Sequence, residues 1–317
     1  MLKRCLCLLL CLLLPLGARA ELLPSLYAAT VSRDARMRVT PEDEGRSLPL
    51  IKSGETVLVH RWAEDWCLCS YGGKAGYLPT ERLFEYIALG DASLPLWQQL
   101  SGLALITQET SAAVEGYKGN TFHPGDLVAL IDDTGRMTMH RSVTTLPEGT
   151  FTYTPFPEDP DDAAPGDMLY AATTYYNEDM TDALGAGRAY NIELAAQRIH
   201  GTELAPGETF SFNALCAPYD KSNGYQRARN ISMSGVGAGG GVCQVSTTLF
   251  NAMLGLDVQL GEFHVHRATG VEYAPLNFDC AVASFRDYTF TNTLTIPLRI
   301  EAYSQQGVLT VLFLRAE

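Results

Sequence analysis

The sequence predicts a multi-domain protein in which small all-β modules precede an α+β domain at the C-terminal end of the 317-residue chain. Short runs of β-forming residues, separated by turn residues, follow residue 20. A stretch rich in proline and acidic residues, 154–167, then interrupts the chain, because such a composition buries too little apolar surface to fold alone. Beyond residue 168, apolar residues recur at helical spacing before β patterns return. The length also exceeds what one hydrophobic core usually holds.

Residues 1–20 have the layout of a secretory signal peptide. Lys3 and Arg4 precede an apolar run, and Ala18 and Ala20 form an A-x-A cleavage site. An uncleaved membrane anchor is the alternative, but the apolar run is well short of the roughly 20 residues that span a bilayer. We therefore expect cleavage after residue 20 and a secreted chain without a transmembrane segment.

The formal net charge of −13 makes the chain acidic. Removal of the basic residues of the signal peptide makes the remaining chain more acidic still. Such a surface disfavours nucleic acid and anionic lipid as partners, because both carry phosphate charge of the same sign.

Three of the eight cysteines leave with the signal peptide. The remaining ones are Cys67, Cys69, Cys216, Cys243 and Cys280. An odd number, and so few in so long a chain, excludes a disulfide scaffold, so at least one thiol is free or pairs with another chain. Cys67 and Cys69 point the same way in a strand pattern, which favours packing over a bridge, and the pair is too isolated for a zinc site.

Residues 21–88 are expected to form a small β barrel. Closely spaced β runs occur at 35–39, 56–60, 66–70 and 76–79. The segments "MRVTP" and "IKSGETVLV", the lone Trp66 before a strand, and "GGKAGYLPTERL" at the close resemble the bacterial SH3-like domain. The resemblance implies a module that binds cell-wall glycan or stem peptide, as such modules commonly do in secreted bacterial proteins.

Residues 89–153 form a second small β module, which has the pattern of a weak SH3-like repeat. "VSRDARMRV…IKSGETVLV" and "ITQETSAAV…FHPGDLVAL" share strand, gap and a turn with glycine before an acid, at Gly54-Glu55 and Gly125-Asp126. Two unrelated β segments with common turn chemistry are the alternative. The acidic, proline-rich linker 154–167 follows, so we place a domain boundary near residue 165.

Residues 168–317 are expected to form an α+β domain with two helices. Their apolar stripes are Ile192, Ala195, Ala196 and Ile199, which Gly201 terminates, and Val245, Leu249, Ala252 and Leu256. Strands are expected in "LGEFHVHR", "VEYAP" and "FDCAVASFRDYTFTN". A final hairpin of 294–302 and 308–314 turns at Gln305-Gln306-Gly307.

Cys243 is the first candidate for chemistry, because three glycines lead it into the opening turn of a helix. Free N–H groups and the helix dipole favour a thiolate there. A papain- or transglutaminase-like thiol enzyme takes its nucleophile, base and orienting acid from separate elements. His264 or His266 could be the base, and Asp279 or Asp287 the orienting acid. The alternative is that the thiol beside Val242 and Val245 is a small buried hydrophobic group.

The histidine-containing strand allows a second interpretation. Side chains alternate on a strand, so Glu262, His264 and His266 share one face. Together with Asp279 they could hold Zn²⁺, or they could form a hydrogen-bonded wall of a ligand cleft. We assign no metal and no cofactor, because such pairs on a strand indicate metal less strongly than a helical H-E-x-x-H.

The glycine run also has two interpretations. The N–H groups of Gly239, Gly240 and Gly241 could bind a carboxylate or an oxyanion, or the glycines could only allow a tight turn. The spacing and lysine of a phosphate loop are missing, which disfavours nucleotide. The further candidate ligand-binding residues are Gln244, Ser246, Thr247, Glu262 and Tyr273.

From about residue 169 to 314 the sequence resembles the VanW family, named for an accessory protein of vancomycin-resistance gene clusters. The strongest segment is "GGGVCQVSTTLFNA" at 239–252. The supporting segments are "RAYNIELAA", "PGETFSFN", "GYQRA", "EFHVH", "YAPLNFDCAV" and "RDYTFTN". Phe263 and Asn277-Phe278 depart from the arginine and the Gly-Arg that are common there, which weakens any role that needs a cation beside Glu262. The family brings no established reaction to this chain.

Two functions follow as hypotheses. The first is an exported envelope protein that binds peptidoglycan or its stem peptide through the SH3-like and VanW-like domains. The second is a cysteine-dependent enzyme that transfers acyl groups or hydrolyses amides of peptidoglycan, with Cys243 as nucleophile and N–H groups near Gly241 as the oxyanion site.

Overall fold

The structure, a computed structural model, describes residues 27–41, 47–63, 65–71, 74–88, 100–117, 119–140, 142–176, 182–230, 235–256, 258–262, 264, 266, 271–274 and 279–317. The expected signal peptide lies outside these residues. The chain divides into two compact units, Met1–Ser93 and Leu94–Glu317, which we describe separately. Within the described part of the chain, no helix has the length and apolar character to cross a membrane.

The first unit is a seven-stranded antiparallel sheet with the order β3-β2-β6-β5-β4-β1-β7. Its strands are β1 (Tyr27–Val31), β2 (Ala35–Arg38), β3 (Ser47–Ile51), β4 (Thr56–Ala63), β5 (Trp66–Tyr71), β6 (Lys74–Pro79) and β7 (Leu83–Ala88). Four of these strands coincide with the four β runs expected from sequence. Cys67 and Cys69 on β5 are fully buried free thiols, in agreement with packing rather than bridging. The unit is β-rich, and its SH3-like character stays a prediction.

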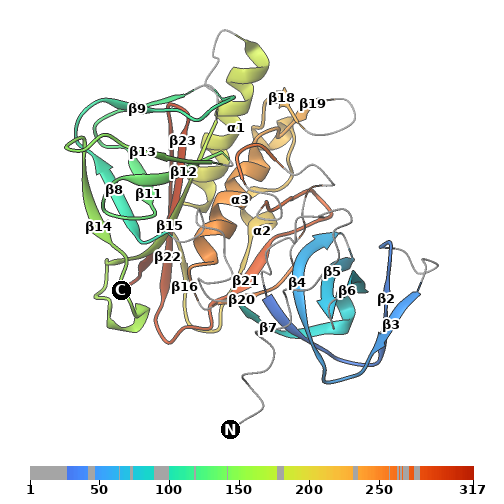
Figure 1. The fold of residues 1–317 in the computed structure, drawn as a ribbon. Coiled ribbons are helices and arrows are strands. Elements are labelled where there is room, and N and C mark those ends of the chain that lie inside the picture. The colour runs from blue at the N-terminus through green and yellow to red at the C-terminus, as the bar shows by residue number, and fades with distance from the viewer. Residues whose placement is uncertain are drawn as a thin grey trace. The chain divides into compact units, whose positions relative to one another are not determined.

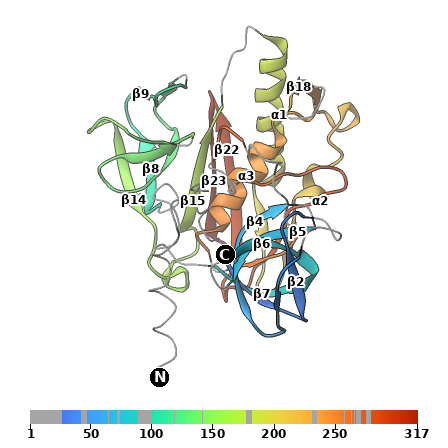
Figure 2. The same ribbon diagram turned by 45° about the vertical axis from the view of Figure 1, so that its right-hand side comes forward.

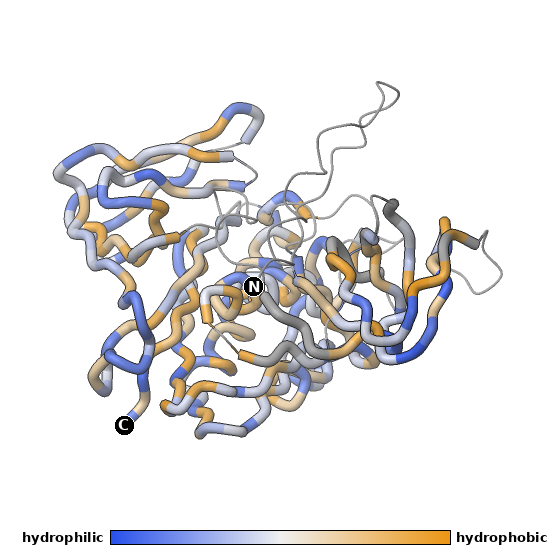
Figure 3. The backbone as a smooth tube through the Cα atoms, turned by 60° about the horizontal axis from the view of Figure 1, so that its bottom comes forward, coloured by the Kyte–Doolittle hydropathy of each residue, from blue (hydrophilic) through white to orange (hydrophobic). Residues whose placement is uncertain are grey.

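Small sheets begin the second unit. Its first strands are β8 (Gly102–Ile106), β9 (Thr110–Ala112), β10 (Asn120–Phe122), β11 (Leu127–Leu130), β12 (Arg136–Met139), β13 (Ser142–Thr145) and β14 (Phe151–Pro155). They pair as β11-β8-β14, β10-β9 and β12-β13. Figure 3 shows hydrophobic and hydrophilic stretches along the backbone. On β12, every second residue is buried, as expected for a strand that buries one face.

The two turns suggested as repeats form the same backbone hydrogen bonds. The N–H of Gly54 donates to Val31 in the first unit, and that of Gly125 donates to Ile106 in the second. Each of these strand residues donates in return to the acidic residue that follows the glycine. Both glycines have positive φ. This shared pattern supports the expectation of a second, related module.

A four-stranded sheet with the order β15-β23-β22-β16 is the centre of the second unit. Its strands are β15 (Met168–Tyr175), β23 (Val308–Arg315), β22 (Leu298–Gln305) and β16 (Thr202–Leu204). β22 and β23 form the expected terminal hairpin, with Gln305 opposite Val308. Gln306 and Gly307 both have positive φ, which a two-residue hairpin turn of type I′ requires.

The central sheet is covered on both faces. Helices α1 (Ala183–Ile199) and α3 (Val242–Met253) pack on one face, and the β8-β11 layer lies on the other (Figures 1 and 2). On β15, Thr174 bonds to Thr248 of α3 at 2.7 Å, while the neighbouring Thr173 accepts the Ala129 N–H of β11 at 2.9 Å. Contacts therefore join the segments on either side of the linker expected at 154–167, and the boundary near residue 165 stays a prediction.

Both helices expected from the apolar stripes are present. The four stripe residues of α1 are buried, and the helix ends before Gly201, whose φ is +81°. On α3, Val245, Leu249 and Ala252 are fully buried, and Leu256 is buried beyond the helix end. The C-terminal region is thus α+β, as expected.

Short elements complete the second unit. They are β17 (Thr209–Ser211), α2 (Phe212–Cys216), β18 (Arg227–Arg229), β19 (Val236–Ala238), β20 (Gln259–Leu260) and β21 (Thr289–Thr291). The prediction of a strand around the histidines is wrong, because β20 ends at Leu260 and the described residues His264 and His266 lie outside any strand. The physical reason is that the backbone N–H of His266 bonds to a side chain, the Asp279 carboxylate, instead of a neighbouring strand.

Candidate active site

The chain enters α3 through three consecutive glycines. Gly241 has a φ of +107°, and a Cβ there would lie 2.9 Å from the backbone oxygen of Arg188. The fully buried amide of Asn191 donates to the Gly240 oxygen at 3.0 Å and holds this turn against α1. Cys243 is consequently the second residue of α3, in the first turn, where the N–H of Val242 donates to the Gly239 oxygen at 3.2 Å and that of Gln244 to the Gly241 oxygen at 2.9 Å. It is partly exposed, whereas the free thiols Cys216 and Cys280 are fully buried.

Cys243, His266 and Asp279 form a hydrogen-bonded series. His266 lies close enough to Cys243 for a side-chain hydrogen bond that shifts the pKa of both groups, and the Cys243 sulfur lies 3.5 Å from the Val282 oxygen. Nδ1 of His266 lies 2.7 Å from Oδ2 of Asp279. Since a carboxylate can only accept, Nδ1 is the donor and Nε2 is the ring nitrogen that remains for the sulfur. Asp279 is 1% exposed, so its carboxylate is sealed behind the imidazole.

The electrostatics of this series favour a thiolate beside an imidazolium. Burial raises the pKa of Cys243, but the hydrogen bond and charge of His266 outweigh burial and lower it below the ordinary thiol value. Burial lowers the pKa of His266, but the hydrogen bonds to Asp279 and Cys243 outweigh it and raise the pKa to about 10. A thiolate is the nucleophilic form of cysteine, so the lowered pKa favours the reactive form of Cys243.

The other thiols of this unit have the opposite electrostatics. Burial raises the pKa of Cys216 to about 12 and that of Cys280 well above its ordinary value. Buried thiols of this kind are inert small hydrophobic groups. Cys243 thus has a lowered pKa, whereas Cys216 and Cys280 have raised ones.

Ser246 and Thr247, expected as ligand-binding residues, instead hold the backbone next to Asp279. The Ser246 hydroxyl donates to the Cys280 oxygen at 2.8 Å, and the Thr247 hydroxyl accepts the Cys280 N–H at 2.9 Å. Both side chains are fully buried. These bonds fix the segment that carries the acid against the helix that carries the thiol.

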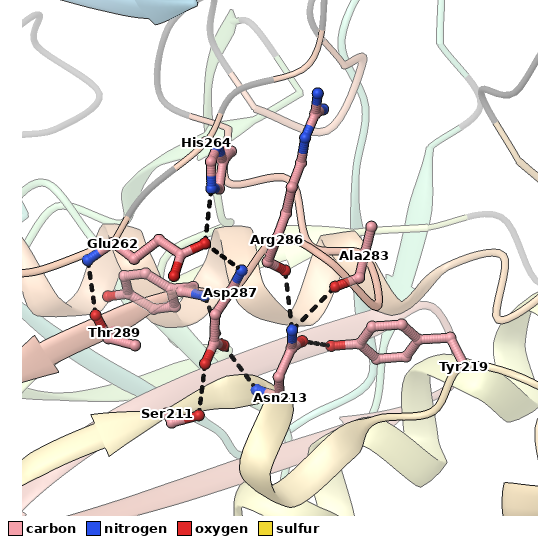
Figure 4. Close-up of polar contacts among 10 residues, drawn as sticks. Ser211, Asn213, Tyr219, Glu262, His264, Ala283, Arg286, Asp287 and Thr289 are labelled. Carbon is pink, nitrogen blue, oxygen red and sulfur yellow. Dashed lines mark hydrogen bonds and ion pairs between the residues drawn. The ribbon is translucent and has the colours of Figure 1, made fainter. Parts of the chain in front are cut away.

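His264 and Asp287, the alternative base and acid, have other partners (Figure 4). His264 Nε2 lies 2.9 Å from Oε1 of Glu262, and the same oxygen accepts the Asp287 N–H at 2.8 Å. The Asp287 carboxylate accepts the Ser211 hydroxyl at 2.6 Å and the Asn213 N–H at 2.8 Å, at the start of α2. The structure therefore brings His266 and Asp279 to the thiol, while His264 and Asp287 connect separate loops.

Gln244 and Tyr273 surround an arginine that the sequence analysis did not single out. Gln244 is fully buried, donates to the Thr174 hydroxyl and the Tyr175 oxygen, each at 3.0 Å, and accepts from Arg188 at 2.7 Å. The Arg188 guanidinium lies 5.8 Å from the centre of the Tyr273 ring. A signal was available, because Arg188 stands four residues before Ile192 on the apolar face of α1, where a charged residue is unexpected.

No group of three or more His, Cys, Asp or Glu side chains lies close enough to hold a metal ion within the described ranges. The paired contacts explain this, since Glu262 binds His264 while Asp279 binds His266.

Comparisons with known proteins agree with the sequence resemblance. Residues 187–314 match the family model described as VanW like protein. The chain is 33% identical over 141 residues to the protein YoaR of Bacillus subtilis, which covers 44% of this chain and 45% of YoaR. It is 37% identical over 65 residues to the vancomycin B-type resistance protein VanW of Enterococcus faecalis, which covers 20% of this chain and 24% of that protein. The match thus spans less than half the length of each relative, and no solved structure matches.

Proposed function

We propose that the VanW-like domain of this chain is a cysteine-dependent enzyme acting on the stem peptide of peptidoglycan, the polymer whose synthesis vancomycin blocks; the domain's match to the VanW model and to a vancomycin-resistance protein supports this. In this proposal the chain is exported and its N-terminal β modules bind the cell wall. The domain transfers or hydrolyses acyl groups through Cys243.

The hydrogen-bonded series of Cys243, His266 and Asp279 carries the proposal. Nucleophilic catalysis by cysteine needs a thiolate, a base in hydrogen-bond contact with it, and a group that orients the base. Here a lowered thiol pKa, a raised imidazole pKa and a buried carboxylate occur in one connected arrangement. A packed structural cysteine needs none of these three features.

The chemistry follows from this arrangement. The Cys243 thiolate forms a bond to the acyl carbon, and the carbonyl π electrons move to oxygen, where the backbone N–H of Cys243 stabilises the charge. Collapse breaks the bond to the leaving amine, which takes the proton from Nε2 of His266. Water or an acceptor amine then attacks the thioester, gives its proton to His266 and releases the thiolate. Asp279 holds the ring and stabilises its positive charge throughout.

Support for the cell wall as substrate is indirect. One relative is named for vancomycin resistance, the N-terminal residues have the layout of a signal peptide, and the first unit resembles a wall-binding module. A peptide substrate fits the thiol, because amides and esters are the acyl donors that a cysteine nucleophile attacks.

Turnover of purified wall fragments tests the proposal. Cys243→Ala should abolish release or exchange of stem-peptide products followed by mass spectrometry. Cys69→Ala is the matched control, since it removes a buried thiol of the other unit and should leave turnover unchanged. An unchanged rate in Cys243→Ala would overturn the proposal that the domain is a cysteine-dependent enzyme.

Thiol titration separates the enzyme from a protein that only binds the wall. A catalytic Cys243 reacts with iodoacetamide well below pH 8, while a packed thiol stays inert in the folded state. Wall binding together with an inert Cys243 would favour the binding protein instead.

A further inference from the structure

Arg188 lies directly beside the nucleophile. Its side chain packs under the turn that leads to Cys243, because a Cβ on Gly241 would meet Arg188 Cγ at 3.1 Å. Its guanidinium donates to Gln244, the residue after Cys243, at 2.7 Å. The guanidinium therefore contacts the residue that follows Cys243, while the aliphatic part of the Arg188 side chain lies against Gly241, the residue before Val242.

The described protein groups accept hydrogen bonds from only part of the Arg188 guanidinium. Arg188 has five N–H donors and, among the described residues, Gln244 is its one hydrogen-bond acceptor. Arg198, ten residues later on α1, shows what a structural arginine does. It donates to the Cys216 oxygen at 3.0 Å and to the Asn223 oxygen at 2.6 Å, and it lies 4.8 Å from the centre of the Tyr225 ring.

The surroundings of Arg188 also lack a carboxylate partner. Burial lowers the pKa of Arg188, and the acidic groups that oppose this shift are Tyr273, Tyr176, Cys243 and, last, Glu272. None of the described carboxylates forms an ion pair with it. A partly buried cation with free donors is costly unless an anion completes its contacts.

We propose that Arg188 binds a carboxylate of the acyl substrate, carried by the residue next to the scissile bond. The assignment rests on the proposed function, because it places the carboxylate relative to the Cys243 sulfur. The planar fork of arginine fits a carboxylate with two parallel hydrogen bonds. Arg188 contacts a neighbour of the nucleophile, and consecutive Cα atoms are about 3.8 Å apart. The bound carboxylate therefore lies within about one residue of the carbon that Cys243 attacks. The substrate class is thus a peptide with a free carboxylate at the bond that is cut.

Two alkylating reagents test this binding without a known substrate. Iodoacetate and iodoacetamide both place a CH₂ group on the thiolate and release iodide, but only iodoacetate carries a carboxylate. The rate of each with Cys243 is measured in the full chain, with peptide mapping to identify the modified thiol. In Arg188→Gln the ratio of the iodoacetate rate to the iodoacetamide rate should fall about tenfold, the value of one charge-assisted hydrogen bond.

Two variants serve as controls. Arg227→Gln removes an equal charge from an exposed position on β18 and should leave the ratio unchanged. Arg188→Lys keeps the charge without the planar fork and should give an intermediate ratio. An unchanged ratio in Arg188→Gln overturns the carboxylate site, and so does an equal slowing with both reagents, which would make Arg188 a group that only stabilises the thiolate.

A competition experiment needs no variant. N-acetylalanine and its amide are each tested as both enantiomers. Their ability to protect Cys243 of the unmodified chain from iodoacetamide is compared. The carboxylate should protect at about tenfold lower concentration than the amide. Equal protection by both overturns the site. A Cys243 that is inert to both reagents instead overturns the proposed function, and the carboxylate site with it.

Discussion

The backbone N–H and the ring Nδ1 of His266 both donate to the same oxygen of Asp279, each at 2.7 Å. One carboxylate oxygen thus fixes the backbone position and the ring orientation of the histidine together. The ring is held so that its other nitrogen serves Cys243, and the burial of Asp279 keeps water from competing for the bond.

Asp279→Asn should reduce kcat/KM on the order of 10² to 10⁴-fold, the range in which general acid–base catalysis contributes. The amide can present an N–H to Nδ1, which places the ring proton on Nε2, so that the nitrogen facing the sulfur can no longer accept the thiol proton. The measurement is turnover together with the pH midpoint of Cys243 alkylation, which should rise. Asp287→Asn is the matched control: it weakens the start of α2, so stability should fall while the alkylation midpoint stays in place.

The pH dependence of stability should distinguish an ion pair from two neutral groups. His266 has a pKa raised from 6.5 to about 10, so its contribution is full below pH 6.5 and is lost as pH rises toward 10. Cys243 has a pKa lowered from 9.0, so its contribution is present above pH 9 and is lost as pH falls through its folded pKa. Between the folded pKa of Cys243 and pH 9 the two slopes oppose each other.

Urea unfolding of the native chain should therefore give a nearly constant contribution from this pair between the folded pKa of Cys243 and pH 9, and a loss of stability above pH 9. Cys243→Ala removes the opposing slope, so its stability relative to the native chain should fall with pH from about 6.5 upward. Parallel pH profiles for the two proteins would contradict the ion pair.

Thr247→Val should destabilise the second unit by about 1–3 kcal/mol, the cost of leaving buried polar groups without partners. The Thr247 hydroxyl accepts the Cys280 N–H and lies 3.3 Å from the Cys280 oxygen. Because Cys280 follows Asp279, the loss should also slow Cys243 alkylation. Thr248→Val is the comparison, since its hydroxyl bonds to Thr174 and the Gln244 oxygen instead, and alkylation should then be little affected despite a similar loss of stability.

The sequence predicted the local patterns of this molecule well and its long-range contacts poorly. The stripe from Ile192 to Ile199 and the terminal hairpin followed from periodicity and turn residues, which are local. The approach of His266 to Cys243 depends on the path of the chain between residues 253 and 279, whose sequence has no sustained periodicity. The sequence therefore offered His264 and His266, and Asp279 and Asp287, as open alternatives.

Buried polar side chains were the hardest to interpret from the sequence. Gln244, Ser246 and Thr247 stand next to the candidate nucleophile, which suggested contact with a ligand. All three are fully buried and bond to the protein. Partners such as Tyr175 and Cys280 are distant in sequence, so no local pattern could identify them.

Gly241→Ala should destabilise the second unit strongly and slow Cys243 alkylation. The φ of +107° is unfavourable for alanine, at a cost on the order of 1–3 kcal/mol, and the added Cβ would lie 2.9 Å from the backbone oxygen of Arg188. Gly207→Ala separates strain from the clash, because Gly207 also has positive φ, +84°, but nothing lies within 4 Å of an added Cβ. Urea unfolding should show a larger loss for Gly241→Ala, and alkylation should slow in that variant alone, since the clash displaces the first turn of α3. Equal losses in the two variants, with unchanged alkylation, would show that the glycine turn does not position the nucleophile.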